Sequence, residues 1–220
     1  MPPFILPFAL YLVLVQLSAH ASNHYPLVYT IGVVLVGVAT FYILYGKGII
    51  KTHRNIGPGI IVGIVGIVVW ILICQLQLEQ SIIRFLPEWF QPGERVSFNP
   101  FQSITQPFWQ WGFVVVRMLG LAVLVPLVEE VFWRGFLLRW VISPDWQDQK
   151  IGVFTMKSFF WVTFLFTLAH PEWLAAAVYC SLLNILLYWR RDLWNCIVAH
   201  GTSNLLLGVY VIYSGTWKLW

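Results

Sequence analysis

The run from Leu127 to Trp140 combines two adjacent carboxylates and an arginine with mainly apolar residues. Glu129, Glu130 and Arg134 are the groups in this run that could do chemistry. An ionisable side chain at membrane depth is costly, and it persists where it faces a polar interior, is paired, or takes part in a reaction. The run is therefore a candidate functional site.

Helical spacing divides the work between the two glutamates. Glu130 and Arg134 are four residues apart with the acid on the N-terminal side, which is the favoured order for an ion pair on one helix face. Glu129 lies about 100° further around the helix and lacks that partner. Glu129 can thus serve as a general base while Arg134 keeps Glu130 charged. A purely structural ion pair, with Glu129 facing water, fits the same spacing.

Two further polar groups of residues occur within apolar runs of the sequence. One ends at His170, and the other runs from His200 to Asn204, which share a helix face because they are four apart. A glutamate assisted by His170 can take a proton from water, while His200 and the Asn204 amide donate to an oxygen that gains negative charge. This arrangement would hydrolyse an acyl bond.

Two other kinds of catalytic site are weighed against this one. The sequence has no serine in a Gly-x-Ser-x-Gly elbow. Glutamate and histidine can also hold zinc, but the sequence has no His-Glu-x-x-His helix. We therefore expect no cofactor, with zinc as the less favoured alternative.

Composition places the chain in a membrane. Of 220 residues, 59% are hydrophobic and 10% charged, and the mean hydropathy is +0.76, values that exclude an ordinary soluble domain. The net charge of +4 then bears on topology and on anionic lipids, and we expect no nucleic-acid partner. Cys74, Cys180 and Cys196 lie in apolar runs without metal-type spacing, which predicts buried thiols.

Hydropathy predicts an all-α, polytopic transmembrane bundle of about seven to eight spans with a polar site at membrane depth. The seven spans cover approximately residues 4–19, 25–45, 56–76, 109–141, 151–170, 173–189 and 193–213. The fourth would make about 50 Å of helix, so we expect Pro126 to divide it, which leaves room for an eighth crossing. In the third span, Gly57, Gly59, Gly63 and Gly66 predict a face that packs closely on a neighbour.

Two segments organise the chain around these spans. Residues 1–107 form the N-terminal spans and an interfacial segment from 77 to 107. The aromatic side chains of this segment suit the outer interface of the membrane: Trp89, Phe90, Phe98 and Phe101. The segment could also cover an entrance. Residues 108–220 form the predicted catalytic core, within one structural unit overall.

The basic loop that carries Lys47, Lys51 and Arg54 predicts the orientation of the chain. By the positive-inside rule this loop and the N-terminus are cytoplasmic, in a bacterial inner membrane. Counting residues from the cytoplasmic helix ends puts both glutamates and His170 about 20 Å deep, Asn204 about 16 Å and His200 about 10 Å. We expect all five groups to meet.

At these residues the sequence resembles the CAAX protease and bacteriocin-processing (CPBP, or Abi) family, which includes the type II CAAX prenyl endopeptidases. Its three motifs occur in order: Glu-Glu-x-x-x-Arg at Glu129, Glu130 and Arg134, Phe-x-x-x-His at Phe166 and His170, and His-x-x-x-Asn at His200 and Asn204. The resemblance covers roughly residues 128–207. It departs from the family at Trp133, where Phe is common, and at Asn195, where Pro often stands.

The resemblance implies an intramembrane endopeptidase of the glutamic type that acts on a membrane-associated protein or peptide, prenylated or carrying a leader or sorting signal. It implies these roles: Glu129 as base, His170 as its assistant in activating water, His200 and Asn204 as the oxyanion site, and Glu130 with Arg134 as their support. A zinc-dependent reaction is the minority interpretation. The alternative functions are a non-catalytic immunity or scaffold protein of the same fold and a proton-linked carrier.

Overall fold

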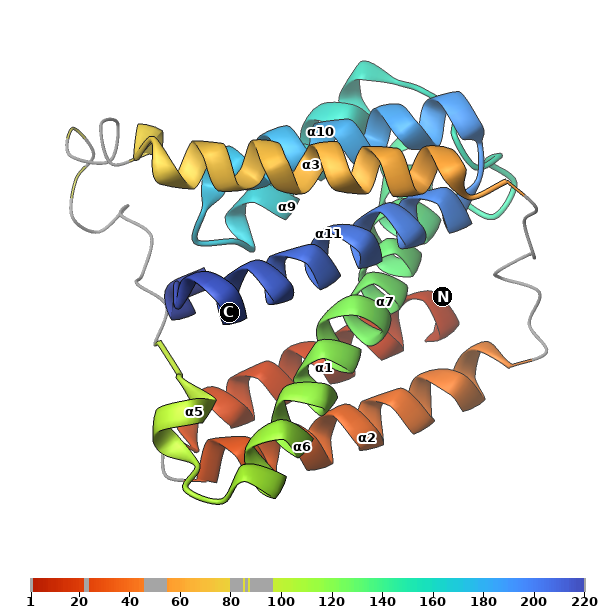
Figure 1. The fold of residues 1–220 in the computed structure, drawn as a ribbon. Helices are drawn as coiled ribbons and strands as arrows, with labels where there is room; N and C mark the ends of the chain where they lie inside the picture. Colours follow the sequence, from red (N-terminus) through yellow and green to blue (C-terminus); the bar gives the residue numbers. More distant parts are fainter. Residues whose placement is uncertain are drawn as a thin grey trace.

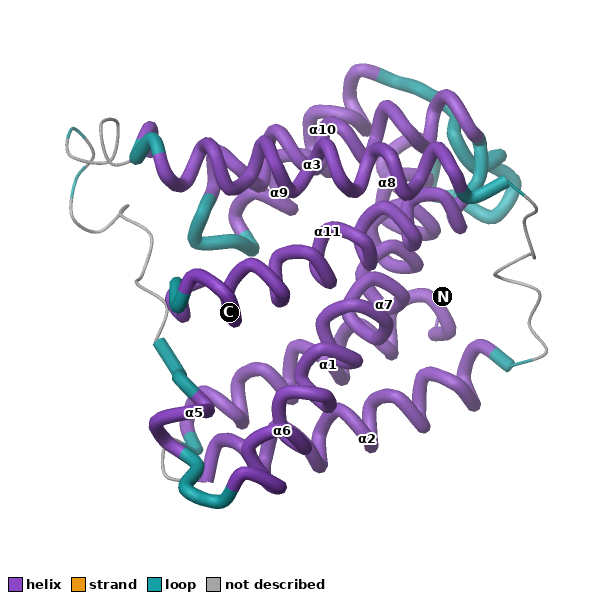
Figure 2. Tube along the Cα trace, in the orientation of Figure 1, coloured by secondary structure: helices purple, strands orange, loops and turns teal. Residues whose placement is uncertain are grey.

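The computed structural model describes residues 2–21, 24–45, 55–79, 85, 87 and 97–219, and its regular secondary structure over these residues is entirely helical. The predicted fold class is thereby confirmed (Figure 2). The elements are α1 (Pro2–His20), α2 (Tyr25–Leu44), α3 (Gly57–Gln75), α5 (Pro100–Ser103), α6 (Pro107–Leu119), η3 (Gly120–Leu124), α7 (Val125–Phe132), η4 (Trp133–Leu137), α8 (Leu138–Ile142), α9 (Met156–Leu168), α10 (Trp173–Arg190), α11 (Leu193–Ser214) and η5 (Trp217–Leu219).

Six helical runs of the described chain are long and apolar enough to cross a membrane, so the protein is an integral membrane protein. They are α1, α2, α3, the run Pro107–Ile142, α10 and α11. The predicted span 151–170 is shorter than expected, because Thr155 caps the N-terminus of α9 and Gly152 precedes it at φ +79°. The 13 residues of α9 make about 20 Å of helix, less than the bilayer core.

The prediction that Pro126 divides the fourth span is wrong, because the helix continues through the proline. η3, a π-helical turn, ends two residues before Pro126, and its wider ring lets Val125 donate to the Gly120 carbonyl. The Leu121 carbonyl then accepts a hydrogen bond from Asn204 Nδ2 at 2.9 Å. Backbone groups displaced around the proline are thus satisfied by the π turn and by α11, so no eighth crossing forms.

The long run from α6 to α8 crosses the molecule between two groups of helices (Figure 1). α1 and α2 pack together on one side, and α1 also contacts α7. α3, α9 and α10 lie on the other side, and α11 packs against α3, α7 and α10. The C-terminal ends of α2 and α10 and the N-terminal ends of α3 and α11 face the same end of the bundle. Polar groups on α7, α10 and α11 are therefore enclosed by protein.

The glycine face predicted for the third span is confirmed. Cβ atoms built on Gly59 and Gly63 of α3 would lie 2.6 Å from the Asn195 carbonyl oxygen and 2.5 Å from that of Ala199. These distances are shorter than any normal contact, so the backbones of α3 and α11 touch where side chains would keep them apart.

Gly63→Ala should lower the stability of the folded protein by about 1–3 kcal/mol, because the added methyl group pushes α3 away from α11. Gly37→Ala on α2 is the matched control, since its Cβ would meet no atom within 4 Å. Thermal unfolding in detergent measures both. Equal midpoints for the two variants would contradict the close packing.

The cysteine prediction holds: Cys180 and Cys196 are buried, Cys74 is half-buried, and all three are free thiols. In the interfacial segment, Phe98 packs on Tyr25 and Phe113, and Phe101 on Trp111 and Trp217. Trp89, Phe90 and the basic residues 47, 51 and 54 lie outside the described residues. The division of the chain at residue 107 stays a prediction.

Candidate active site

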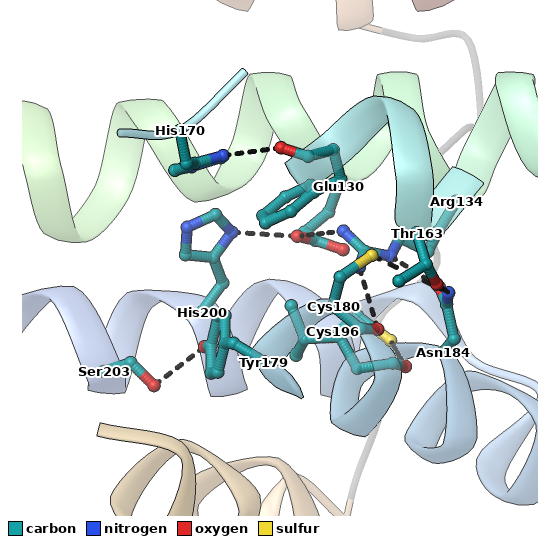
Figure 3. A network of polar contacts seen from close by, with 12 residues as sticks. Glu130, Arg134, Thr163, His170, Tyr179, Cys180, Asn184, Cys196, His200 and Ser203 are labelled. Carbon is teal, nitrogen blue, oxygen red and sulfur yellow. Dashed lines mark hydrogen bonds and ion pairs between the residues drawn. The ribbon is translucent and has the colours of Figure 1, made fainter. Parts of the chain in front are cut away.

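Glu130 is the centre of a buried polar network that joins three transmembrane elements. Its Oε1 accepts from Arg134 Nη1 at 3.0 Å and lies 2.8 Å from His200 Nδ1. The Glu130 and Arg134 side chains are fully buried. Figure 3 shows the carboxylate between the imidazole and the guanidinium. The predicted Glu130–Arg134 ion pair therefore forms, and it extends to α11 through His200.

The guanidinium of Arg134 is also bound by α10. Its Nε donates to Asn184 Oδ1 at 3.1 Å, and Nη2 lies 3.3 Å from the Cys180 carbonyl oxygen and 3.0 Å from Cys180 Sγ. Asn184 Nδ2 in turn lies 3.2 Å from Thr163 Oγ1 on α9. All three nitrogens of this buried guanidinium thus have a hydrogen-bond partner within the protein.

Glu129 is buried beside this network but is bound differently. Its side chain projects about 100° around α7 from that of Glu130, and it is 7% exposed. Its Oε2 receives no hydrogen bond from any described residue. Glu130 Oε2 likewise receives no hydrogen bond from a described residue, so what distinguishes the two glutamates is the ion pair that Glu130 forms through Oε1.

His170 lies two residues beyond the end of α9. The helix ends at Leu168, three residues before Pro171. His170 Nδ1 donates to the Phe166 carbonyl at 2.8 Å, and the two rings stack with centroids 4.4 Å apart. The Phe166 ring also faces the Arg134 guanidinium at 5.1 Å. Because Nδ1 is the donor, Nε2 of the neutral ring is a proton acceptor.

Aromatic side chains connect His170 with His200. The Trp70 ring contacts His170 at 6.1 Å and Tyr179 at 6.0 Å, and Tyr179 contacts His200 at 5.9 Å. The Tyr179 hydroxyl donates to Ser203 Oγ at 2.7 Å, and Ser203 Oγ lies 2.8 Å from the Gly63 carbonyl oxygen. Both imidazoles therefore border one rigid aromatic wall built from α3 and α10.

The structure links three of the sequence-predicted groups directly through Glu130. Glu130 contacts Arg134 and His200 directly, whereas Asn204 contacts the Leu121 carbonyl and His170 contacts the Phe166 carbonyl. Among the described residues, no three His, Cys, Asp or Glu side chains converge as metal ligands. Because these residues do not fit a zinc site, we derive no step through a metal.

The segment that contains all of these motif residues matches the model of a known protein family. Residues 110–206 match the model of the family described as type II CAAX prenyl endopeptidase Rce1-like. Over these residues, which make up less than half of the chain, the protein is similar to the Rce1-like family of CAAX proteases. No curated protein and no solved structure matches the chain. The resemblance stated from the motifs is confirmed, and it is a resemblance to intramembrane endopeptidases.

The two departures from the motifs of CAAX proteases each have a structural role here. Trp133 is buried, and its ring packs edge-on against Phe166 at 5.5 Å. Asn195 Oδ1 accepts from the Gly59 amide at 2.9 Å, and its Nδ2 donates to the Asn55 carbonyl at 3.2 Å. A proline at position 195 could form neither bond, so the asparagine ties the start of α11 to the start of α3.

Sequence reasoning missed residues that support the candidate site from α10 and from the segment just beyond α3. Asn184, Cys180 and Tyr179 carried no signal beyond an isolated polar group in an apolar run. Glu79, just beyond α3, accepts from the Leu174 and Ala175 amides at 2.8 and 3.1 Å and so caps α10 next to His170. Burial raises the pKa of the Glu79 carboxyl, and the two amide donors oppose that rise. The position of His170 thus depends partly on a segment outside the family match.

Proposed function

We propose that the protein is an intramembrane endopeptidase that hydrolyses a peptide bond of a membrane-associated substrate with water activated by Glu129 and His170. The observation that carries this proposal is the difference between the two buried glutamates. Oε2 of both glutamates is buried without a donor among the described residues, but Glu130 is bound through Oε1 to Arg134 and His200. Glu129 is therefore the glutamate whose carboxylate oxygens are not held in an ion pair by any described residue. A base needs such an oxygen to receive the proton of a water molecule.

In the proposed reaction, the water oxygen attacks the carbonyl carbon of the scissile bond while Glu129 takes the water proton. His170 assists because its Nε2 can accept a hydrogen bond from the same water, with Nδ1 held by the Phe166 carbonyl. When the carbon–nitrogen bond breaks, Glu129 passes its proton to the departing amine. The water is thereby divided between the products, since its hydroxyl group joins the new carboxyl end and its proton joins the new amine end.

His200 and Asn204 are the proposed donors to the oxyanion. His200 Nδ1 faces the Glu130 carboxylate, so His200 donates from Nε2 only as an imidazolium. Asn204 uses one amide hydrogen on Leu121 and keeps its second for substrate.

The substrate class follows from the position of the site. Because the network is enclosed by α7, α10 and α11 within the membrane bundle, the substrate must be a membrane-associated protein or peptide, prenylated or carrying a leader or sorting signal. We place the N-terminus and the C-terminal ends of α2 and α10 on the cytoplasmic side of a bacterial inner membrane, since Arg190 and Arg191 lie at the end of α10.

The test is cleavage of a library of lipid-anchored and transmembrane peptides by the purified protein in liposomes, with products identified by mass spectrometry. Cleavage at a defined bond supports the proposal. Proton flux into the same liposomes without any cleavage would favour the proton-linked carrier, and neither activity would favour the scaffold.

Removal of divalent metal should leave this cleavage within about twofold of its starting rate, because a glutamate base needs no Lewis acid. The measurement is the same assay after incubation with a chelator and after re-addition of zinc. Activity that is lost with the chelator and returns with zinc would establish the metal-dependent alternative.

A further inference from the structure

Asn184 is a fully buried amide that reaches the network from outside the three sequence motifs. It lies on α10 one helical turn after Cys180, and both residues face Arg134. A buried asparagine is costly unless its polar atoms are bonded. Asn184 meets this condition by using its oxygen on Arg134 and its nitrogen on Thr163.

The contacts with α10 determine how the planar guanidinium of Arg134 is turned. Nε and Nη2 lie along one edge of the group, and this edge faces Asn184 Oδ1 and Cys180. Nη1 then points away from α10 toward Glu130. Because the group is rigid and planar, fixing one edge fixes the direction of the remaining donor.

Thr163 on α9 determines which way the Asn184 amide is turned. Its hydroxyl oxygen lies 3.2 Å from Asn184 Nδ2, which accounts for the amide nitrogen facing α9 and the amide oxygen facing Arg134. A reversed amide would place an NH2 group against the guanidinium. A continuous chain of contacts therefore runs from Thr163 through Asn184, Arg134 and Glu130 to His200 (Figure 3).

At its far end the chain decides which nitrogen of His200 carries the proton. The ionised Glu130 carboxylate is only an acceptor, so His200 Nδ1 must be the donor. Nε2 then faces away from Glu130, and it can donate to a substrate oxygen only when the ring gains a second proton. The orientation of this imidazole depends on where Arg134 holds the Glu130 oxygen.

We propose that Asn184 is a positioning residue that, with Thr163, orients the Arg134 guanidinium and thereby holds His200 as the Nδ1–H tautomer. The consequence for catalysis rests on the proposed function, whereas the tautomer itself does not. No substrate is needed to measure it.

The experiment is ¹⁵N NMR of histidine-labelled full-length protein in micelles at alkaline pH, where imidazoles are neutral. The two tautomers give well-separated nitrogen signals, and the His200 signals are assigned by their absence from His200→Gln. The wild-type protein should show a protonated Nδ1 and an unprotonated Nε2. Asn184→Leu, which keeps the volume and removes the amide, should give a mixture of tautomers, and Asn184→Asp, which keeps an acceptor, should retain the wild-type state.

Asn195→Leu is the matched control, since Asn195 is also a buried asparagine but binds α3 rather than Arg134. It should leave the His200 tautomer unchanged. Where Asn184→Leu does not fold, Thr163→Val replaces it, because this isosteric change removes only the group that orients the amide. An Nε2–H tautomer in the wild type, or a folded Asn184→Leu or Thr163→Val protein with the wild-type signals, would overturn the proposal.

Peptide cleavage adds a second readout. Asn184→Leu should lower kcat by about a hundredfold while KM changes little, as expected when a reacting group is misplaced by about 1 Å. If the wild-type protein cleaves no peptide, the proposed function fails, and the NMR result still decides whether Asn184 positions His200.

Discussion

Glu129→Gln should leave the protein folded in the membrane and lower peptide cleavage by about two to four orders of magnitude. Glutamine has nearly the same shape as glutamate, but it cannot accept the proton of a water molecule, and general bases typically contribute a factor of this size. The fold should survive because Glu129 takes part in neither of the ion pairs that the described residues form at this site. The measurement is the initial rate of cleavage in liposomes.

Asp145→Asn is the matched control for this variant. It makes the same change from carboxylate to amide at an exposed residue in the loop that follows α8, and it should retain full activity. Circular dichroism and the elution volume in detergent show whether each variant is folded. A Glu129→Gln protein that cleaves at the wild-type rate would refute the assignment of Glu129 as base.

Arg134→Met should destabilise the folded protein by about 3–5 kcal/mol, which is the usual cost of leaving a buried charge without its partner. Arg134 and Glu130 are both fully buried, with Nη1 and Oε1 only 3.0 Å apart. Once the guanidinium is removed, the Glu130 carboxylate keeps only the hydrogen bond with His200 among the described residues. Denaturant unfolding in mixed micelles, followed by circular dichroism, measures the loss.

The double variant Glu130→Gln, Arg134→Met should regain a large part of this stability, because it contains no uncompensated charge. It should nevertheless cleave poorly, since the group that holds His200 has gone. If the losses of the two single variants simply add in the double variant, Glu130 and Arg134 do not stabilise one another. A double variant as active as the wild type would show that the ion pair does not support the site.

These two predictions give Glu129 and Glu130 different roles. Glu129 should matter for the rate and little for stability, whereas Glu130 should matter for both. The contacts account for the difference, because Glu130 is linked to Arg134 and His200 and through them to α10 and α11. An intramembrane hydrolase needs both kinds of group, since a reactive carboxylate is useful only when its surroundings are held still.

Local features of the chain were readable without a structure. The spans follow from runs of apolar residues, and the ion pair follows from the four-residue spacing of Glu130 and Arg134 on one helix. The close approach of α3 to its neighbours follows from Gly59, Gly63 and Gly66. Each of these features depends on residues within about one or two turns of one helix, so the sequence alone is sufficient to predict it.

The tertiary structure alone decided which groups meet across the bundle. Glu130 and His200 are 70 residues apart and Arg134 and Asn184 are 50 apart, so no local spacing relates them, and depth estimates treated both glutamates as equivalent. The run through Pro126 stayed helical because a π turn and Asn204, 83 residues beyond Leu121, satisfied its backbone. Packing therefore determined the partners of each polar group, because a buried donor or acceptor binds whatever the neighbouring helices bring within reach.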